Sequence, residues 1–207
     1  NFFYTRSSRD NMGSSSWSNF ITMPPTIPVY DANNPGGYGY GSSDRANTYA
    51  LNPVAQENIN ESVNDEEYMY GNIFGQLNLF KDVFKAKLNL AYKSYYGITN
   101  SLRKKGNWTM GQGDDAASVS SSMAKHHDIL IEHTYTFDKT FGKHDVDAMV
   151  GMSYNRFHQE TRSATKLDPL TVGDKYITSI SAATGTTSAT GGYTESALIS
   201  YLGRVNY

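Results

Sequence analysis

Several residues that commonly bind metal ions lie close together between positions 126 and 133. They are His126, His127, Asp128, Glu132 and His133. Such imidazole and carboxylate groups bind zinc when about four of them converge on one ion. The surrounding pattern is that of a β-strand, in which successive side chains point to opposite faces. His126, Asp128 and Glu132 then share one face and His127 and His133 the other, so the sequence predicts no metal site.

Two pairs of aspartates are the next candidates for chemistry. Asp145 and Asp147 would lie on one face of a strand, roughly 6–7 Å apart, a separation that glycosidases use for paired carboxylates. They directly follow a short turn, so we expect water-facing positions away from any cleft. Asp114 and Asp115 lie in a glycine-rich segment, but the spaced acidic pattern of a calcium loop does not surround them. No nucleophile–base pair can be assembled, so the sequence predicts no enzyme and no cofactor.

Aromatic residues in the irregular segments are better candidates for binding. Trp17, Tyr38, Tyr40 and Trp108 lie among Gly, Asn and Ser residues that favour loops. Flat rings on loops can stack on sugar faces, and loops often carry binding residues. We therefore predict these four as substrate-binding residues. The alternative is that the rings pack loop against loop, which is the more common role of such residues.

The strand that carries the histidines is one limb of a long hairpin, from Ile129 to Phe157. Apolar and polar residues alternate in both limbs, which places one set on each face. The apolar set is Ile129, Ile131, His133, Tyr135 and Phe137 in the first limb and Val146, Ala148, Val150, Met152 and Tyr154 in the second. The limbs are roughly 12–16 residues long, well beyond the usual strand of about five or six. Long strands with one apolar face suit a wall between lipid and water.

The same alternation predicts six strands. They lie near residues 1–7, 68–80, 84–97, 127–138, 143–158 and 194–207. The connections between them are alternately long and short, as in outer-membrane barrels with long extracellular loops and short periplasmic turns. Lys85, Lys87 and Lys93 share one face, which must be in water because each would cost about 2–4 kcal/mol near the centre of a bilayer. We therefore expect an all-β fold: an antiparallel up-and-down meander, forming part of a transmembrane β-barrel over residues 1–207.

Composition excludes several other classes of protein. The net charge is −2 and there is no basic patch, which argues against nucleic-acid binding. The chain has no cysteine, and its longest aliphatic run, Ile129–Ile131, is far too short for a membrane-spanning helix. The chain begins at Asn1 without a signal peptide and ends within a strand pattern at Tyr207, so we expect it to be a fragment.

Three segments together resemble a known family. They are ESALISYLGRVNY (195–207), TFDKTFGKHDVDAMVGMSY (136–154) and the looser ALNPVA (50–55). They are similar to the barrel of SusC/RagA-type TonB-linked outer-membrane proteins of Gram-negative bacteria. The resemblance implies a 22-stranded barrel, of which this chain would be a part, with an N-terminal plug domain that is absent here. It also implies uptake of oligosaccharides or peptides, with a SusD-like surface lipoprotein, TonB acting through the plug, and outer-membrane lipid as partners.

Two alternatives belong to other functional classes. The first is a secreted soluble β-sheet glycan-binding module or adhesin, with its apolar faces packed between two sheets. The second is a hydrolase embedded in a barrel. The strand lengths and the alternation of loop lengths disfavour the first, and the lack of a nucleophile–base pair disfavours the second.

Overall fold

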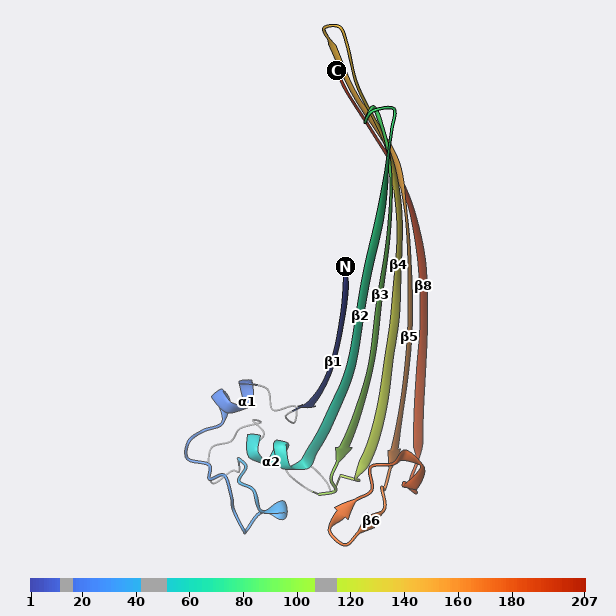
Figure 1. Ribbon diagram of the computed structural model, residues 1–207. Coiled ribbons are helices and arrows are strands. Elements are labelled where there is room, and N and C mark those ends of the chain that lie inside the picture. Colours follow the sequence, from blue (N-terminus) through green and yellow to red (C-terminus); the bar gives the residue numbers. More distant parts are fainter. Residues whose placement is uncertain (12–16, 42–51, 107–114) are drawn as a thin grey trace.

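The protein folds into one tall, curved antiparallel sheet whose strands follow one another in chain order (Figure 1). The computed structural model describes residues 1–11, 17–41, 52–106 and 115–207. The strands, in their order across the sheet, are β1 (Phe2–Asn11), β2 (Asn60–Leu79), β3 (Phe84–Arg103), β4 (Ser118–Phe141), β5 (His144–Leu167) and β8 (Thr187–Asn206). The predicted all-β meander is therefore confirmed. β1 and β8 form the two edges and do not pair with each other, so the described strands make an open sheet.

The strands are longer than the sequence predicted, mostly at one end. β4 begins at Ser118 instead of near residue 127, and β5 continues to Leu167 instead of ending near 158. β2, β3 and β8 are extended in the same way. In these extensions Ser, Thr and Asn occupy both faces, so no apolar alternation marks them. The ladder of antiparallel backbone pairs nevertheless continues through them without a break.

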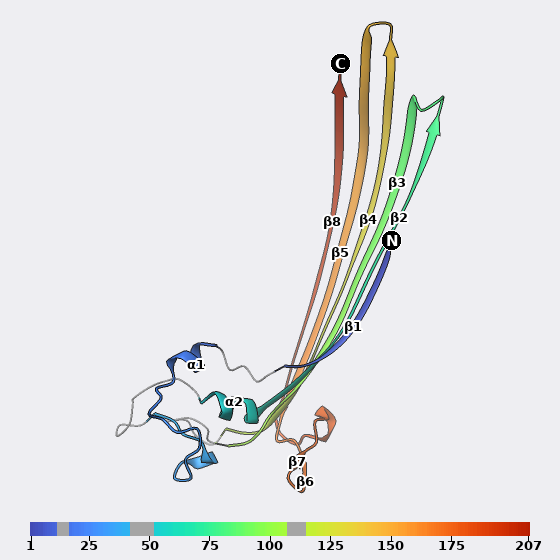
Figure 2. The same ribbon diagram turned by 60° about the vertical axis from the view of Figure 1, so that its left-hand side comes forward.

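The alternation of long and short connections is confirmed. The long connections gather at one end of the sheet and the two short turns lie at the other (Figure 2). One short turn spans residues 80–83, and the other is only Gly142 and Lys143. Gly142 has a φ of +66°, a conformation that glycine adopts at little cost in a two-residue hairpin. The predicted strands ended near residue 138 and began again near residue 143, whereas β4 continues to Phe141 and β5 begins at His144.

The segment predicted to be irregular from Ser8 to about Glu66 contains two short helices, α1 (Trp17–Thr22) and α2 (Pro53–Ile59). Asn52 is the N-cap of α2, since its side-chain oxygen accepts hydrogen bonds from the backbone N–H groups of Val54 and Ala55. The loop before β8 contains the two-residue strands β6 (Thr171–Val172) and β7 (Lys175–Tyr176) and a 3₁₀ turn at Ile180–Ala182. Among the described residues, no helix is long and apolar enough to cross a membrane.

The buried apolar residues of the described segments are few, and they lie at the end with the long connections. Leu102, Val119 and Ala183 form a small cluster, with Tyr176 and Ile180 packed against it. Nothing in the described part of the chain covers the two faces of the sheet along most of its height. The sheet therefore has no conventional core.

Candidate functional site

One face of the sheet carries an uncovered apolar band. One of its rows consists of residues that are in register across five strands: Ile73, Leu90, Ile131, Tyr154 and Ile199. Ile73 is 69% exposed and Ile199 is 53% exposed. Apolar rows continue toward the short turns as far as the row that contains Phe137. We call the surface between the Ile129 row and the Phe137 row the apolar band; its limit at the Ile129 row also contains Arg156, which forms an ion pair with Glu195.

A line of rings borders the apolar band on the side of the long connections. Tyr92, His127, His158 and Tyr193 come from β3, β4, β5 and β8, and their ring centroids are 5.9, 6.2 and 4.8 Å apart in that order. The Tyr92 hydroxyl also lies 2.8 Å from His127 Nδ1. Rings with one polar atom are well suited to a boundary between an apolar and an aqueous phase.

The opposite face is mainly polar over the same height, although Phe74, Leu198 and Leu202 are also exposed on it. Asn72 Nδ2 donates to Asn89 Oδ1 at 2.7 Å, and Asn89 Nδ2 donates to Glu132 Oε2 at 2.9 Å. This chain of amide and carboxylate groups crosses β2, β3 and β4. Lys87, also on this face, lies with its ammonium group 5.3 Å from the centre of the Phe74 ring. The sheet thus has one apolar and one polar face.

The candidate acid–base pair lies beside the short turn, as the sequence predicted. Asp147 accepts hydrogen bonds from Arg204 Nη2 and Asn206 Nδ2, each at 3.0 Å. Asp145 accepts one from Thr140 Oγ1 at 2.9 Å. Both carboxylates therefore have partners on their own face, and their interactions stabilise the hairpin end.

The histidines of the 126–133 segment are divided between the two faces, as the strand pattern required. His126 stacks on Tyr95 at 4.8 Å and lies 6.1 Å from Phe157 on the polar face. His127 is part of the ring line on the apolar face. Within the described ranges, no group of three His, Cys, Asp or Glu side chains could hold a metal ion.

The described segments contain three of the four predicted loop aromatics, Trp17, Tyr38 and Tyr40. Trp17 is the first residue of α1, and Trp108 lies outside the described residues, as does Asp114. The ring of Tyr38 packs against Tyr30 with centroids 5.6 Å apart, which is the loop-packing alternative for this residue. Tyr40 is half-buried in the same loop. A role of these residues in binding substrate stays a prediction.

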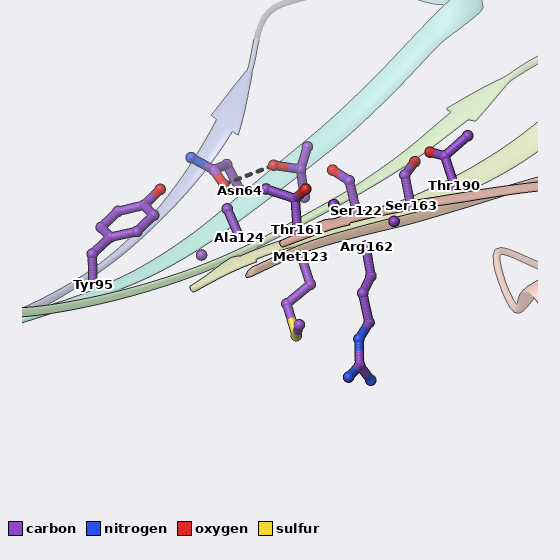
Figure 3. A pocket seen from close by; sticks show the side chains of 13 residues that line it. Asn64, Tyr95, Ser122, Met123, Ala124, Thr161, Arg162, Ser163 and Thr190 are labelled. Carbon is purple, nitrogen blue, oxygen red and sulfur yellow. Dashed lines mark hydrogen bonds between the residues drawn. The ribbon is translucent and has the colours of Figure 1, made fainter. Parts of the chain in front are cut away.

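A hollow of about 380 Å³ lies on the polar face (Figure 3). It is closer to the long connections than the part of the sheet whose other face carries the apolar band. We call it the hydroxyl hollow. Two rows of small side chains form its floor: Asn64, Thr99, Ser122, Ser163 and Thr190, and next to them Gly97, Ala124, Thr161 and Gly192. Figure 3 shows these side chains rising on one side of the sheet, while Met123 and Arg162 point away on the other. The hollow exists because five neighbouring strands carry small residues at the same level.

Tyr95 forms one wall of the hydroxyl hollow. A Cβ atom at Gly97 would lie 2.5 Å from the Tyr95 hydroxyl oxygen and 2.9 Å from the nearest ring carbon, so the hydroxyl end of the ring covers Gly97. The hydroxyl group donates a hydrogen bond to Glu66 Oε1 at 3.0 Å. Asn64 Nδ2 donates to the same oxygen at 2.8 Å, and Thr99 Oγ1 donates to Asn64 Oδ1 at 2.9 Å. These hydrogen bonds fix the position of the Tyr95 ring at the border of the hollow.

The groups beside the hydroxyl hollow favour a neutral surface. Tyr95 and His126 lie beyond the apolar band, on the side of the long connections. Partial burial, with the nearby Lys93 charge as a second cause, lowers the pKa of His126. Partial burial and the bond to Glu66 raise the pKa of Tyr95. At neutral pH both rings are uncharged, and the Glu66 carboxylate already has two donors.

Sequence reasoning did not find the hydroxyl hollow. The predicted strands ended near residue 97 and resumed near residue 127, so Thr99, Ser122 and Ala124 of the floor lay in a predicted connection. A tyrosine two positions before a glycine on a strand was the available signal, since such a ring can lie over the position without a side chain. Comparison with protein families and with curated proteins finds no match for this chain.

Proposed function

We propose that this chain is part of the wall of a transmembrane β-barrel in the outer membrane of a Gram-negative bacterium. The observation that supports this proposal is the apolar band. Its height, from the Ile129 row to the Phe137 row, is eight residues, or roughly 26 Å along the strand. A tilt of about 40° reduces this to roughly 20 Å, close to the roughly 25 Å apolar band of such barrels. Hydrocarbon is the environment that such an uncovered band would favour.

The open sheet edges support the same proposal. In lipid, unpaired backbone N–H and C=O groups cost several kcal/mol each, so only closed barrels and helices span membranes. β1 and β8 would therefore pair with further strands of the same barrel. The short turns would face the periplasm and the long connections the exterior. The polar face, with Lys87 and Glu132, would line the lumen.

The importer function is the further part of the proposal, and it is supported by the resemblance of residues 136–154 and 195–207 to SusC/RagA-type proteins. In this proposal the barrel takes up oligosaccharides or peptides, a plug fills its lumen, TonB acts through the plug, and a SusD-like lipoprotein covers the mouth. This chain performs no covalent chemistry. It separates lipid from lumen and presents loops and lumen wall to the substrate.

Two epitope insertions into the intact protein test this topology. We expect a tag between Gly142 and Lys143 to be hidden from antibody in intact cells and exposed after the outer membrane is permeabilised. A tag at Gly173, in the last long connection, should be exposed in both. If both tags are accessible in intact cells, or the protein is found in the soluble fraction, the barrel proposal is wrong.

A separate experiment tests import. We expect uptake of labelled oligosaccharide or peptide to be lost when the gene or TonB is deleted.

The alternative, a secreted glycan-binding module or adhesin, is favoured by one observation: the hydroxyl hollow requires no membrane. In that case the apolar band would have to be covered by a second apolar surface in water. Detergent-free solubility of the intact protein would support this alternative over the barrel.

A further inference from the structure

The chemistry of the hydroxyl hollow indicates what kind of molecule it fits. Its volume of about 380 Å³ lies in the roughly 300–1,000 Å³ range of ligand sites. Serine and threonine hydroxyls both donate and accept hydrogen bonds. No hydrogen bond of the described residues engages the hydroxyls of Ser122, Thr161, Ser163 or Thr190. These groups are available to a ligand that is rich in hydroxyl groups.

Charge and shape restrict the ligand further. Arg162 is the cationic residue among those that line the hollow, and its side chain points to the opposite side of the sheet (Figure 3). The nearby carboxylate, Glu66, is already bonded to Tyr95 and Asn64. A charged ligand would thus find no free counter-ion on the floor. Beside the floor, the Tyr95 and His126 rings stack on each other, with centroids 4.8 Å apart and an interplanar angle of 16°, and the hydroxyl end of Tyr95 lies over Gly97 at the border of the hollow.

We propose that the hydroxyl hollow is a binding subsite for a neutral carbohydrate chain. One sugar ring would lie against the Tyr95 ring at the border of the hollow, because the C–H groups of a sugar and an aromatic ring are both apolar. Its hydroxyl groups would bond to Ser122, Thr161 and Ser163 across β4 and β5. The subsite differs from the four loop aromatics predicted from the sequence, and it selects glycan over peptide among the proposed cargoes.

The position of the subsite agrees with a role in uptake, which is the part of this inference that rests on the proposed function. Ser122 is seven residues beyond Ile129, roughly 23 Å along β4. The hollow would therefore lie on the lumen wall above the membrane, near the external mouth. Cargo would meet it before reaching the lumen between the lipid-embedded strands.

The test measures binding to the intact protein in detergent, with a pool of neutral hexasaccharides (α-glucan, β-glucan and mannan) and a pool of hexapeptides as probes. Saturation-transfer NMR identifies the bound sugar, and calorimetry gives its Kd. We expect Tyr95→Ala to weaken sugar binding about tenfold. Tyr95→Phe keeps the ring and should change the Kd little. Thr161→Val, which keeps the shape of the floor but removes a hydroxyl, should weaken binding several-fold.

Matched controls come from the same strands. Met123→Ala and Arg162→Ala alter side chains that neighbour the floor residues but point to the other side of the sheet (Figure 3). Both should bind sugar as the unchanged protein does. No binding of any neutral hexasaccharide, or equal losses in Thr161→Val and Arg162→Ala, would overturn the subsite. The epitope test of topology is independent of this result, so failure of the subsite and failure of the barrel proposal are distinguishable.

Discussion

A single arginine in the apolar band gives a quantitative test of the proposed lipid contact. Val150 is 59% exposed and is paired with Tyr135 and Gly203 in the sheet. Met152 lies in the central row of the band, two residues away, so Val150 is roughly 7 Å from the centre along the strand. With a tilt of about 40° it is roughly 5 Å from the proposed bilayer midplane. This position is close to where charges are most costly.

We expect Val150→Arg to lower the free energy of unfolding by about 3 kcal/mol, since Arg costs about 2–4 kcal/mol at the midplane. That is a change of about a hundredfold in the unfolding equilibrium. The assay is urea unfolding of the intact protein in lipid vesicles, followed by the mobility shift of folded barrels in unheated gels. Ser153→Arg, three residues further along β5, is the matched control. Ser153 is on the polar face opposite Glu132, so this variant should change stability by less than about 1 kcal/mol.

The reasoning is refuted if the two arginines have equal effects. An arginine on a water-exposed sheet face away from special features changes stability by only about 0.5 kcal/mol. Equal and small effects would mean that both faces are in water. A large effect of Ser153→Arg with a small effect of Val150→Arg would mean that the faces are assigned the wrong way round.

Two other predictions concern the end with the long connections. Gly97→Ala places a Cβ 2.5 Å from the Tyr95 hydroxyl and should destabilise the protein by about 1–3 kcal/mol in the same unfolding assay, whereas Gly75→Ala, with nothing within 4 Å, should cost less than about 1 kcal/mol. Equal costs for the two glycine variants would show that the Tyr95 ring does not lie over Gly97. Asn52→Ala removes the N-cap of α2 and two donated bonds to the carbonyls of Val29 and Gly39, so backbone amides of α2 should exchange hydrogen about tenfold faster or more. The control is Asn58→Ala, whose exposed side chain bonds only to Val54 O, and equal exchange in both variants would contradict the capping role.

The strands that carry the apolar band could be predicted from the sequence because the apolar or polar character of each residue there indicates the face on which it lies. Ile131 and Val150 alternate with Glu132 and Gly151, and that period of two determines both the strand and its faces. The short turn at Gly142 was also predictable. These are local features, which a single sequence displays directly.

The extensions and the hydroxyl hollow could not be predicted in the same way. In β4 from Ser118 to Ser122 four of the five residues are serine, so no apolar alternation marks the strand and only pairing with β3 and β5 reveals it. The floor of the hollow depends on the register that brings Thr99, Ser122 and Ser163 to one level. The helix α2 was missed although Asn52 followed by Pro53 is a common helix start.

A cysteine scan across the apolar band tests the central claim most directly. Residues 1–207 contain no cysteine, so, once any cysteine elsewhere in the intact protein is replaced by serine, single cysteines at positions 129–137 can each carry a spin label in lipid vesicles. We expect collisions with oxygen, which concentrates in lipid, to be frequent at odd positions such as Ile131 and Tyr135. Collisions with a water-soluble nickel complex should dominate at even positions such as Glu132 and Thr134. If the odd positions show no more oxygen contact than the even ones, the apolar face is not in a bilayer and the account is wrong.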